Sequence, residues 1–195
     1  MIEVITGCMY SGKSEELIRR LRRCQIAGQR VLVLKSDLDW RYSTDSVATH
    51  IGVTLPAYAV RDADHVREHL LQTSFRRSVE VIGLDEVQFM SSEIIPLLEE
   101  QANSGVRVIV AGLDLDSAGR PFGPMAELIA VADQVDKLAA VCVAHDAVRG
   151  GPCGKPATRS YRIPDADTGV RVQVGSTGMY EARCRTCWSH GLRRV

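Results

Sequence analysis

The segment Ile2–Ser14 constrains the fold of this chain more than any other stretch. It opens with a short apolar run rich in β-branched residues, Ile2–Ile5, which breaks at a glycine. The pattern Gly7-x-x-x-x-Gly12-Lys13-Ser14 follows, and a helical pattern begins at Glu15. A strand, a glycine loop and a helix in this order are the context that a phosphate-binding loop requires. The segment therefore predicts a binding site for a nucleoside triphosphate.

The residue types in this loop predict its chemistry. Glycines let the backbone bend around an anion, and the amides at the start of the following helix point at that anion. Lys13 is expected to reach the β- and γ-phosphates of ATP, and the Ser14 hydroxyl to ligate Mg²⁺. The alternative is a glycine-rich turn that happens to carry a lysine, and the flanking strand and helix argue against it.

Composition limits the partners and the environment of the protein. Its 195 residues suffice for one domain with a core, or one domain and a small addition. The 24 Lys and Arg residues balance 24 Asp and Glu residues, so the whole-chain charge does not favour long nucleic acid. The chain starts directly on the first strand and contains no apolar run of membrane-spanning length. We therefore expect a soluble, cytoplasmic protein without a signal peptide or a membrane partner.

Strand and helix patterns alternate along residues 1–141, the range expected to form a nucleotide-binding domain. Such alternation with short links specifies an α/β fold with a mostly parallel sheet and helices on both faces. Four arginines between residues 19 and 23 are interpreted as a solvated helix face rather than a nucleic-acid patch. Further strands are predicted at Val31–Leu34, Val79–Leu84, Val106–Ala111 and Gln134–Val141, and helices at Asp62–Phe75, Ser91–Asn103 (with a serine cap) and Met125–Val131.

The polar stretch after the strand Val31–Leu34 contains Asp39 and Arg41, and His50 follows it. Loops at strand ends carry the ligands of α/β sheets, so Asp39 and Arg41 are candidate site residues, with ordinary loop charges as the alternative. For His50 a structural hydrogen bond is the more common role. His65 and His69 have a metal-compatible spacing, but no carboxylate–histidine context supports a site, and they are interpreted as surface residues.

A second informative stretch is the β-branched strand that ends in Asp85-Glu86. Asp85 is expected to hold Mg²⁺, directly or through water, as the acidic strand of a phosphate-loop protein does. Side chains alternate along a strand, so Glu86 points elsewhere and suits a general base that takes a proton from an attacking hydroxyl or water. A helix N-cap with a dipole-stabilising acid fits both residues locally just as well, and the phosphate loop upstream decides between the two interpretations.

The composition changes at Cys142, and residues 142–195 are expected to form a separate zinc-binding domain. Helical periodicity disappears here, glycines are frequent, and cysteines gather in a region with few large apolar residues. Cys184-x-x-Cys187 supplies one half of a four-ligand zinc site, while Cys142, His145 and Cys153 compete for the other two places. The alternative is a chance cluster of thiols.

Taken together, these motifs resemble the zinc-containing (type II) thymidine kinases over essentially the whole chain, from about Ile2 to His190. Asp-Glu-x-Gln-Phe after a strand, combined with the phosphate loop, is the most specific part. The resemblance rests on Gly7–Ser14, Asp39-x-Arg41-Tyr42, Asp85-Glu86-x-Gln88-Phe89, Gly112-Leu113-Asp114, Pro121-Phe122-Gly123 and the terminal cysteines.

This resemblance implies a RecA-like α/β domain with the ATP site and a small zinc domain whose lasso loop closes over thymidine. It also implies a cytoplasmic homotetramer that phosphorylates thymidine with ATP, Mg²⁺ and Zn²⁺, with Glu86 as the base that deprotonates the 5′-hydroxyl. The implied cofactor-binding residues are Gly7, Cys8, Met9, Tyr10, Ser11, Gly12, Lys13, Ser14, Asp39, Trp40, Arg41, Asp85, Glu86, Val87 and Gln88. The implied nucleoside-binding residues are Met9, Ser117, Arg171, Val172, Gln173, Val174, Gly175 and Tyr180.

The sequence departs from the family pattern at two places. The family usually has an aromatic residue three positions after the Asp of Gly-Leu-Asp, and this chain has Ser117 there. The family also has its first two zinc cysteines close together, the second followed by Gly-x-x-Ala. Cys153 has that tail but lies far from Cys142, while His145 has the short spacing without the tail. We favour Cys153, with the intervening stretch as an insertion.

Two other functions compete with thymidine phosphorylation. One is a deoxynucleoside kinase with altered base choice, because of Ser117. The other is a phosphate-loop ATPase whose zinc module binds nucleic acid. Neutral charge and the absence of a basic stripe interleaved with aromatic residues argue against the second.

Overall fold

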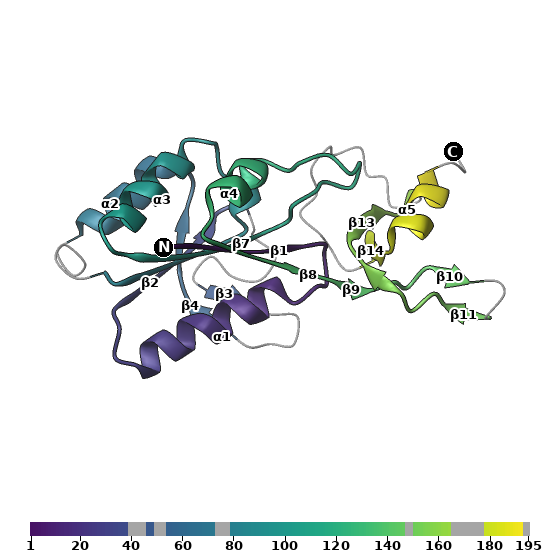
Figure 1. The fold of residues 1–195 in the computed structure, drawn as a ribbon, viewed down its shortest axis with the longest axis horizontal. Coiled ribbons are helices and arrows are strands. Elements are labelled where there is room, and N and C mark those ends of the chain that lie inside the picture. Colours follow the sequence, from purple (N-terminus) through teal and green to yellow (C-terminus); the bar gives the residue numbers. More distant parts are fainter. Residues whose placement is uncertain (39–45, 49–53, 73–78, 147–149, 165–177, 193–195) are drawn as a thin grey trace.

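The computed structural model describes residues 1–38, 46–48, 54–72, 79–146, 150–164 and 178–192. The larger part of the described chain is built around a six-stranded, fully parallel sheet (Figure 1). In spatial order its strands are β5 (Tyr58–Val60), β2 (Val31–Ser36), β6 (Val81–Asp85), β7 (Arg107–Gly112), β1 (Ile2–Gly7) and β8 (Gln134–Leu138).

Helices cover both faces of the sheet, as the alternating pattern predicts (Figure 1). Helix α1 (Lys13–Ile26) packs on one face together with the β3–β4 hairpin (Ser46–Ala48 and Thr54–Pro56). The opposite face carries three further α-helices of the described region, and the short 3-10 helix η1 (Val87–Phe89) follows β6. The three α-helices are α2 (Ala63–Leu71), α3 (Ile94–Asn103) and α4 (Met125–Val131).

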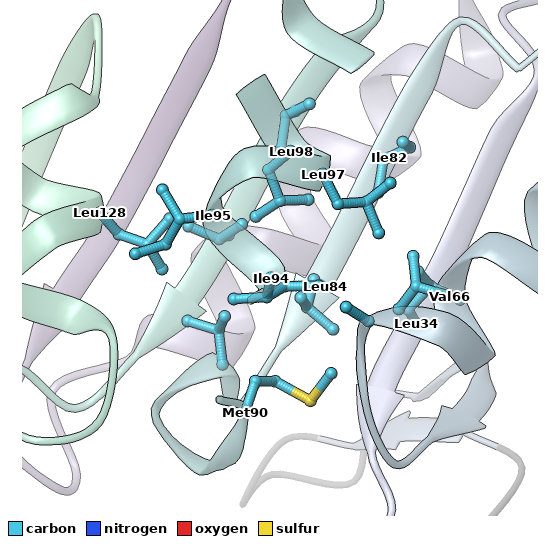
Figure 2. Close-up of a cluster of buried hydrophobic side chains, with 14 of the residues drawn as sticks. Leu34, Val66, Ile82, Leu84, Met90, Ile94, Ile95, Leu97, Leu98 and Leu128 are labelled. Atoms are coloured by element: carbon cyan, nitrogen blue, oxygen red, sulfur yellow. The ribbon is translucent and has the colours of Figure 1, made fainter. Parts of the chain in front are cut away.

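The larger hydrophobic core lies between the sheet and α2–α4 (Figure 2). Leu34, Ile82 and Leu84 point from the strands towards Ile94 and Leu98 on α3, and all five side chains are fully buried. Burying each such side chain stabilises the fold by roughly 1.5–3 kcal/mol. This core holds the central strands rigidly, which fixes the positions of the loops that leave their carboxyl ends.

The arginines of α1 are not a uniformly solvated face. The Arg20 side chain is only 12% exposed and forms ion pairs with Glu3 at 2.7 Å and Asp136 at 2.7 Å. Arg107 pairs with the other oxygen of Glu3 at 2.6 Å. Glu3 is buried on β1 and needs these partners, because an unpaired charge there would be very costly. The interpretation as a solvated face was therefore wrong for Arg20.

Helix α3 begins later than predicted, at Ile94, and Ser91 is not its cap. The Ile94 amide donates to the Ser91 carbonyl at 3.1 Å in a preceding turn. A helix beginning at Ser92 would place Pro96 beyond its first turn, where the missing N–H removes a helical hydrogen bond. The later start keeps Pro96 within the first turn.

The predicted strand Gln134–Val141 is two strands. Strand β8 ends at Leu138 because its partner β1 ends at the residue paired with it, Gly7. Strand β9 (Ala140–Val141) then leaves the sheet and pairs with β12 (Pro156–Ala157). The region beyond β8 also contains β10 (His145–Asp146), β11 (Gly151–Pro152), the antiparallel pair β13 (Arg159–Arg162) and β14 (Tyr180–Arg183), and helix α5 (Arg185–Leu192).

Helix α5 was missed because its residues show no clear apolar period. Two of the cysteines discussed above lie at its start, Cys184 just before it and Cys187 within it. The interpretation of His69 as a surface residue was also wrong. This ring is buried against Tyr58, at a centroid distance of 4.8 Å, and stacks on His65 at 4.9 Å.

Candidate active site and metal centre

The phosphate-loop sequence forms the strand–loop–helix unit that was predicted for it. Strand β1 ends at Gly7 and helix α1 begins at Lys13. Gly7 has a φ of 144°, and a Cβ there would overlap the carbonyl oxygen of Leu138 on the neighbouring strand. Only glycine satisfies both conditions, so the position of the turn is set by β8 as well as by the loop itself.

Lys13 and Ser14 lie at the mouth of this loop with different partners. The Lys13 ammonium donates to the Cys8 carbonyl at 2.8 Å, and the Ser11 hydroxyl donates to the same oxygen at 2.8 Å. The Ser14 hydroxyl lies near the Asp85 carboxylate and lowers its pKa. A serine hydroxyl beside a carboxylate, next to a lysine at the start of a helix, is suited to a divalent cation and a phosphate chain.

Asp85 and Glu86 occupy different environments although they are adjacent. Asp85 ends β6 and is 4% exposed; burial, and then the charge of Glu86, raise the pKa of its carboxyl to about 7. The Ser14 hydroxyl and the Glu86 amide oppose this shift by stabilising the ionised form. Glu86 is only half-buried, and its backbone has a φ of 55°.

The left-handed backbone at Glu86 is uncommon for a residue other than glycine and costs on the order of 1 kcal/mol. The Gln88 side chain supports this arrangement. Its amide nitrogen donates to the Glu86 carboxylate, and its carbonyl oxygen accepts from the Leu113 amide at 3.1 Å. Gln88 therefore ties Glu86 to the segment that follows β7.

That segment, residues 113–123, is called the β7 loop below. Its stem is closed by a bridge between Leu115 and Pro121 and by the Phe122 amide, which donates to the Asp114 carbonyl at 3.1 Å. The Phe122 ring meets Phe89 edge-on, with centroids 5.5 Å apart at 86°. The Asp114 carboxylate is buried and pairs with Lys137 at 2.5 Å.

Four cysteines gather beyond the sheet and form what is called the cysteine cluster below. Their sulfur atoms all lie within 4.8 Å of one another, and three of the four residues are buried. Burial and the neighbouring thiols raise the pKa of Cys187 to about 12. The members are Cys142, Cys153, Cys184 and Cys187.

The donor set and its size fit a structural zinc ion. Four thiolates at the usual Zn–S distance of about 2.3 Å form a tetrahedron with sulfur atoms about 3.8 Å apart, which the cluster can reach with small side-chain adjustments. His145 lies on β10, is exposed, and is not among the described residues of the cluster. Among the described residues it is Cys153 that completes the cluster, in keeping with the alternative favoured on the sequence.

The spacing between Cys142 and Cys153 has a structural explanation. Strands β10 and β11, which lie between the two cysteines in sequence, form a short antiparallel pair (Figure 1). Two backbone hydrogen bonds hold the two ends of this stretch side by side. The Cys153 amide donates to the Ala144 carbonyl at 2.8 Å, and the Gly154 amide donates to the Cys142 carbonyl at 2.9 Å. The stretch between the two cysteines therefore leaves both sulfur atoms at one site.

Comparison with known proteins agrees with this geometry. The model of the thymidine kinase family matches residues 1–188. The thymidine kinase of Deinococcus deserti is 49% identical over 194 residues, covering 94% of this chain and 92% of the relative. That of Deinococcus radiodurans is 48% identical over 190 residues, covering 93% and 86%. This chain belongs to the thymidine kinase family. The resemblance drawn from the sequence motifs is confirmed.

As in other α/β proteins, the candidate site of this thymidine kinase family member lies at the carboxyl ends of its sheet strands. The loops after β1, β6 and β7 meet there because β7 lies between the other two. Asp39, Trp40, Arg41, His50 and Arg171–Gly175 lie outside the described residues. Tyr180 is described, at the start of β14.

The sequence analysis missed the contacts that join the phosphate loop to the C-terminal region. The Met9 amide donates to the Ser160 hydroxyl at 3.0 Å, and the Tyr10 hydroxyl donates to the Tyr180 carbonyl at 3.3 Å. The Cys8 thiol donates to the Ala157 carbonyl at 3.2 Å. These hydrogen bonds join residues far apart in sequence, so no local sequence pattern predicts them.

Within the part of the chain that the structure describes, no helix is long and apolar enough to cross a bilayer.

Proposed function

We propose that this protein transfers the γ-phosphoryl group of ATP to the 5′-hydroxyl of thymidine. The observation that carries the proposal is the position of Glu86, a half-buried carboxylate held by Gln88. It directly follows Asp85, which lies near Ser14 and Lys13 of the phosphate loop in this thymidine kinase family member. In this reaction the Glu86 carboxylate accepts the hydroxyl proton as the oxygen attacks the γ-phosphorus, and ADP leaves.

The other residues of the site have supporting roles in the proposal. Lys13 and the amides at the start of α1 offset the charge of the transferring phosphoryl group. Ser14 and Asp85 are the residues that would hold Mg²⁺, which screens the phosphate charge when bound. The cysteine cluster would hold one zinc ion, which organises the C-terminal region. The homotetramer and the cytoplasmic location implied by the family resemblance remain predictions.

A nucleoside panel tests the proposal directly. We expect ATP-dependent formation of thymidine monophosphate when the zinc-loaded protein is incubated with thymidine and Mg²⁺, and much slower reaction with deoxycytidine, deoxyadenosine and deoxyguanosine. ADP release and nucleotide product are measured in the same samples. ATP hydrolysis stimulated by single-stranded DNA but not by thymidine would support the nucleic-acid-binding ATPase instead. The ion pairs that occupy Arg20 disfavour that alternative.

Altered base choice is the nearer alternative, and a substitution at Ser117 tests it. We expect Ser117→Phe to lower the KM for thymidine about fivefold, because a ring adds apolar area and a stacking term of roughly 1 kcal/mol. The backbone carbonyl of Ser117, which accepts a hydrogen bond from Trp188, survives the substitution. Steady-state kinetics at saturating ATP give the measurement, with Ser117→Ala as the control that removes only the hydroxyl. A raised KM would mean that Leu115 or another side chain already fills the space.

A further inference from the structure

Trp188 lies between the cysteine cluster and the β7 loop. It directly follows Cys187 on α5, and its backbone amide donates to the Cys184 carbonyl at 2.9 Å. Any metal held by Cys184 and Cys187 therefore fixes the backbone from which the indole projects. The side chain is half-buried, which indicates that it is in contact with other parts of the protein.

Those contacts are made with the tip of the β7 loop. The indole N–H donates to the Ser117 carbonyl at 3.2 Å. The ring also lies over Gly119, where an added Cβ would stand 2.7 Å from Cη2 of Trp188. Gly119 has a φ of 78°, so both its backbone conformation and the close approach of the ring require glycine. The indole is thus held by a directed hydrogen bond and by close apolar contact.

The β7 loop can pass this restraint on to the reacting groups because it is internally braced. At its tip the Asp116 carboxylate accepts from the Arg120 amide at 2.9 Å and from the Arg120 guanidinium at 3.1 Å. At its base the Leu113 amide donates to Gln88, whose side chain in turn donates to Glu86. One continuous set of contacts therefore runs from the cysteine cluster to the proposed base.

We propose that Trp188 is a positioning residue that fixes the β7 loop to the cysteine cluster, so that thymidine affinity depends on bound zinc through this side chain. The proposal rests on the proposed function, since the affinity in question is that for thymidine. Trp188 needs no contact with the nucleoside for this role.

Two substitutions separate the components of the contact. Trp188→Leu removes both the donor and the ring, whereas Trp188→Phe keeps a ring over Gly119. We expect KM for thymidine to rise about tenfold in Trp188→Leu and roughly threefold in Trp188→Phe. We expect kcat to fall as well, because the same contacts reach Glu86, and KM for ATP to change less than about twofold. Zinc content, measured on the same samples, is expected to stay at one ion per chain. Ser189→Ala on the same helix is the matched control, since among the described residues its hydroxyl donates to the Thr186 carbonyl within α5.

Hydrogen–deuterium exchange provides a readout that needs no catalytic activity. In the zinc-loaded protein, Trp188→Leu should speed amide exchange in a peptide covering residues 113–123, and not in one covering β2. Removing zinc from the parent with a chelator should speed exchange in the same loop. Unchanged exchange in the loop of Trp188→Leu would overturn the proposal even if the parent phosphorylates no nucleoside.

The outcomes are distinguishable. A parent protein without thymidine phosphorylation refutes the proposed function, and loop exchange still decides the role of Trp188. An active parent with an unchanged thymidine KM in Trp188→Leu refutes the positioning role alone. Loss of zinc from both variants also refutes it, because Trp188 would then act by building the metal site. If Trp188→Leu does not fold, the KM, zinc content and loop exchange of Trp188→Phe decide.

Discussion

Glu86→Gln is expected to lower kcat for thymidine phosphorylation by roughly 10²–10⁴-fold while leaving KM for ATP nearly unchanged. The amide is nearly isosteric with the carboxylate but cannot accept the proton of the 5′-hydroxyl. The phosphate loop and the side chains of Ser14 and Asp85, which would hold ATP and Mg²⁺, are retained. Removing the Glu86 charge lowers the pKa of Asp85, which favours the ionised form suited to Mg²⁺. Steady-state kinetics with varied thymidine and varied ATP give both constants.

Two further variants serve as a comparison and a control for Glu86→Gln. Lys13→Ala should also abolish turnover, but by weakening ATP binding or the stabilisation of transition-state charge, so KM for ATP or its binding constant changes as well. Glu127→Gln is the matched control, because Glu127 is an exposed carboxylate on α4 away from the site. Turnover of Glu86→Gln close to that of the parent would remove Glu86 from the mechanism.

Protein purified without chelator is expected to contain one zinc ion per chain, and Cys184→Ser to lose it. Structural zinc contributes directly to folding free energy, with apparent binding energies of about 10–16 kcal/mol in small zinc domains, so its loss should locally unfold β13, β14 and α5. Metal analysis, thermal melting and hydrogen exchange are the measurements. We expect exchange to rise in β13, β14 and α5 and to stay slow in β1 and β7.

The assignment of the fourth ligand can be checked in the same way. Cys153→Ser should lose zinc, and His145→Ala should keep it, because His145 is exposed on β10. Cys24→Ala controls for the loss of a buried thiol outside the cluster. The prediction fails if the parent holds no zinc. Retention by Cys153→Ser together with loss by His145→Ala would instead assign the fourth ligand to His145.

Local patterns predicted the parts of the fold and site that depend on neighbours in sequence. The strand–loop–helix unit around Lys13 follows from glycine placement and periodicity, and the strand ending at Asp85 from its β-branched residues. The parallel sheet with helices on both faces then follows from the alternation of elements. The structure confirms this fold class.

Features that depend on residues far apart in sequence could not be predicted. The ion pairs of Arg20 require Glu3 and Asp136 to converge on one side of α1, and the helical pattern of the arginines gives no sign of this. The contact between Trp188 and Gly119 similarly joins α5 to the β7 loop, two segments that no sequence motif connects. The break after Leu138 is set by the length of β1 rather than by any residue at the break.

The β10–β11 pair between Cys142 and Cys153 affects how related proteins can be found by searching for a cysteine motif. A search template that demands a fixed short gap between the first two thiols rejects this chain, although the sulfur geometry is intact. Lengthening a closed loop is thermodynamically cheap, since each doubling costs only about 0.6 kcal/mol. A longer gap is therefore tolerated when backbone hydrogen bonds such as those of Cys153 and Gly154 hold its two ends together. Templates anchored on the residues after the second thiol, with a variable gap before it, would accept this chain.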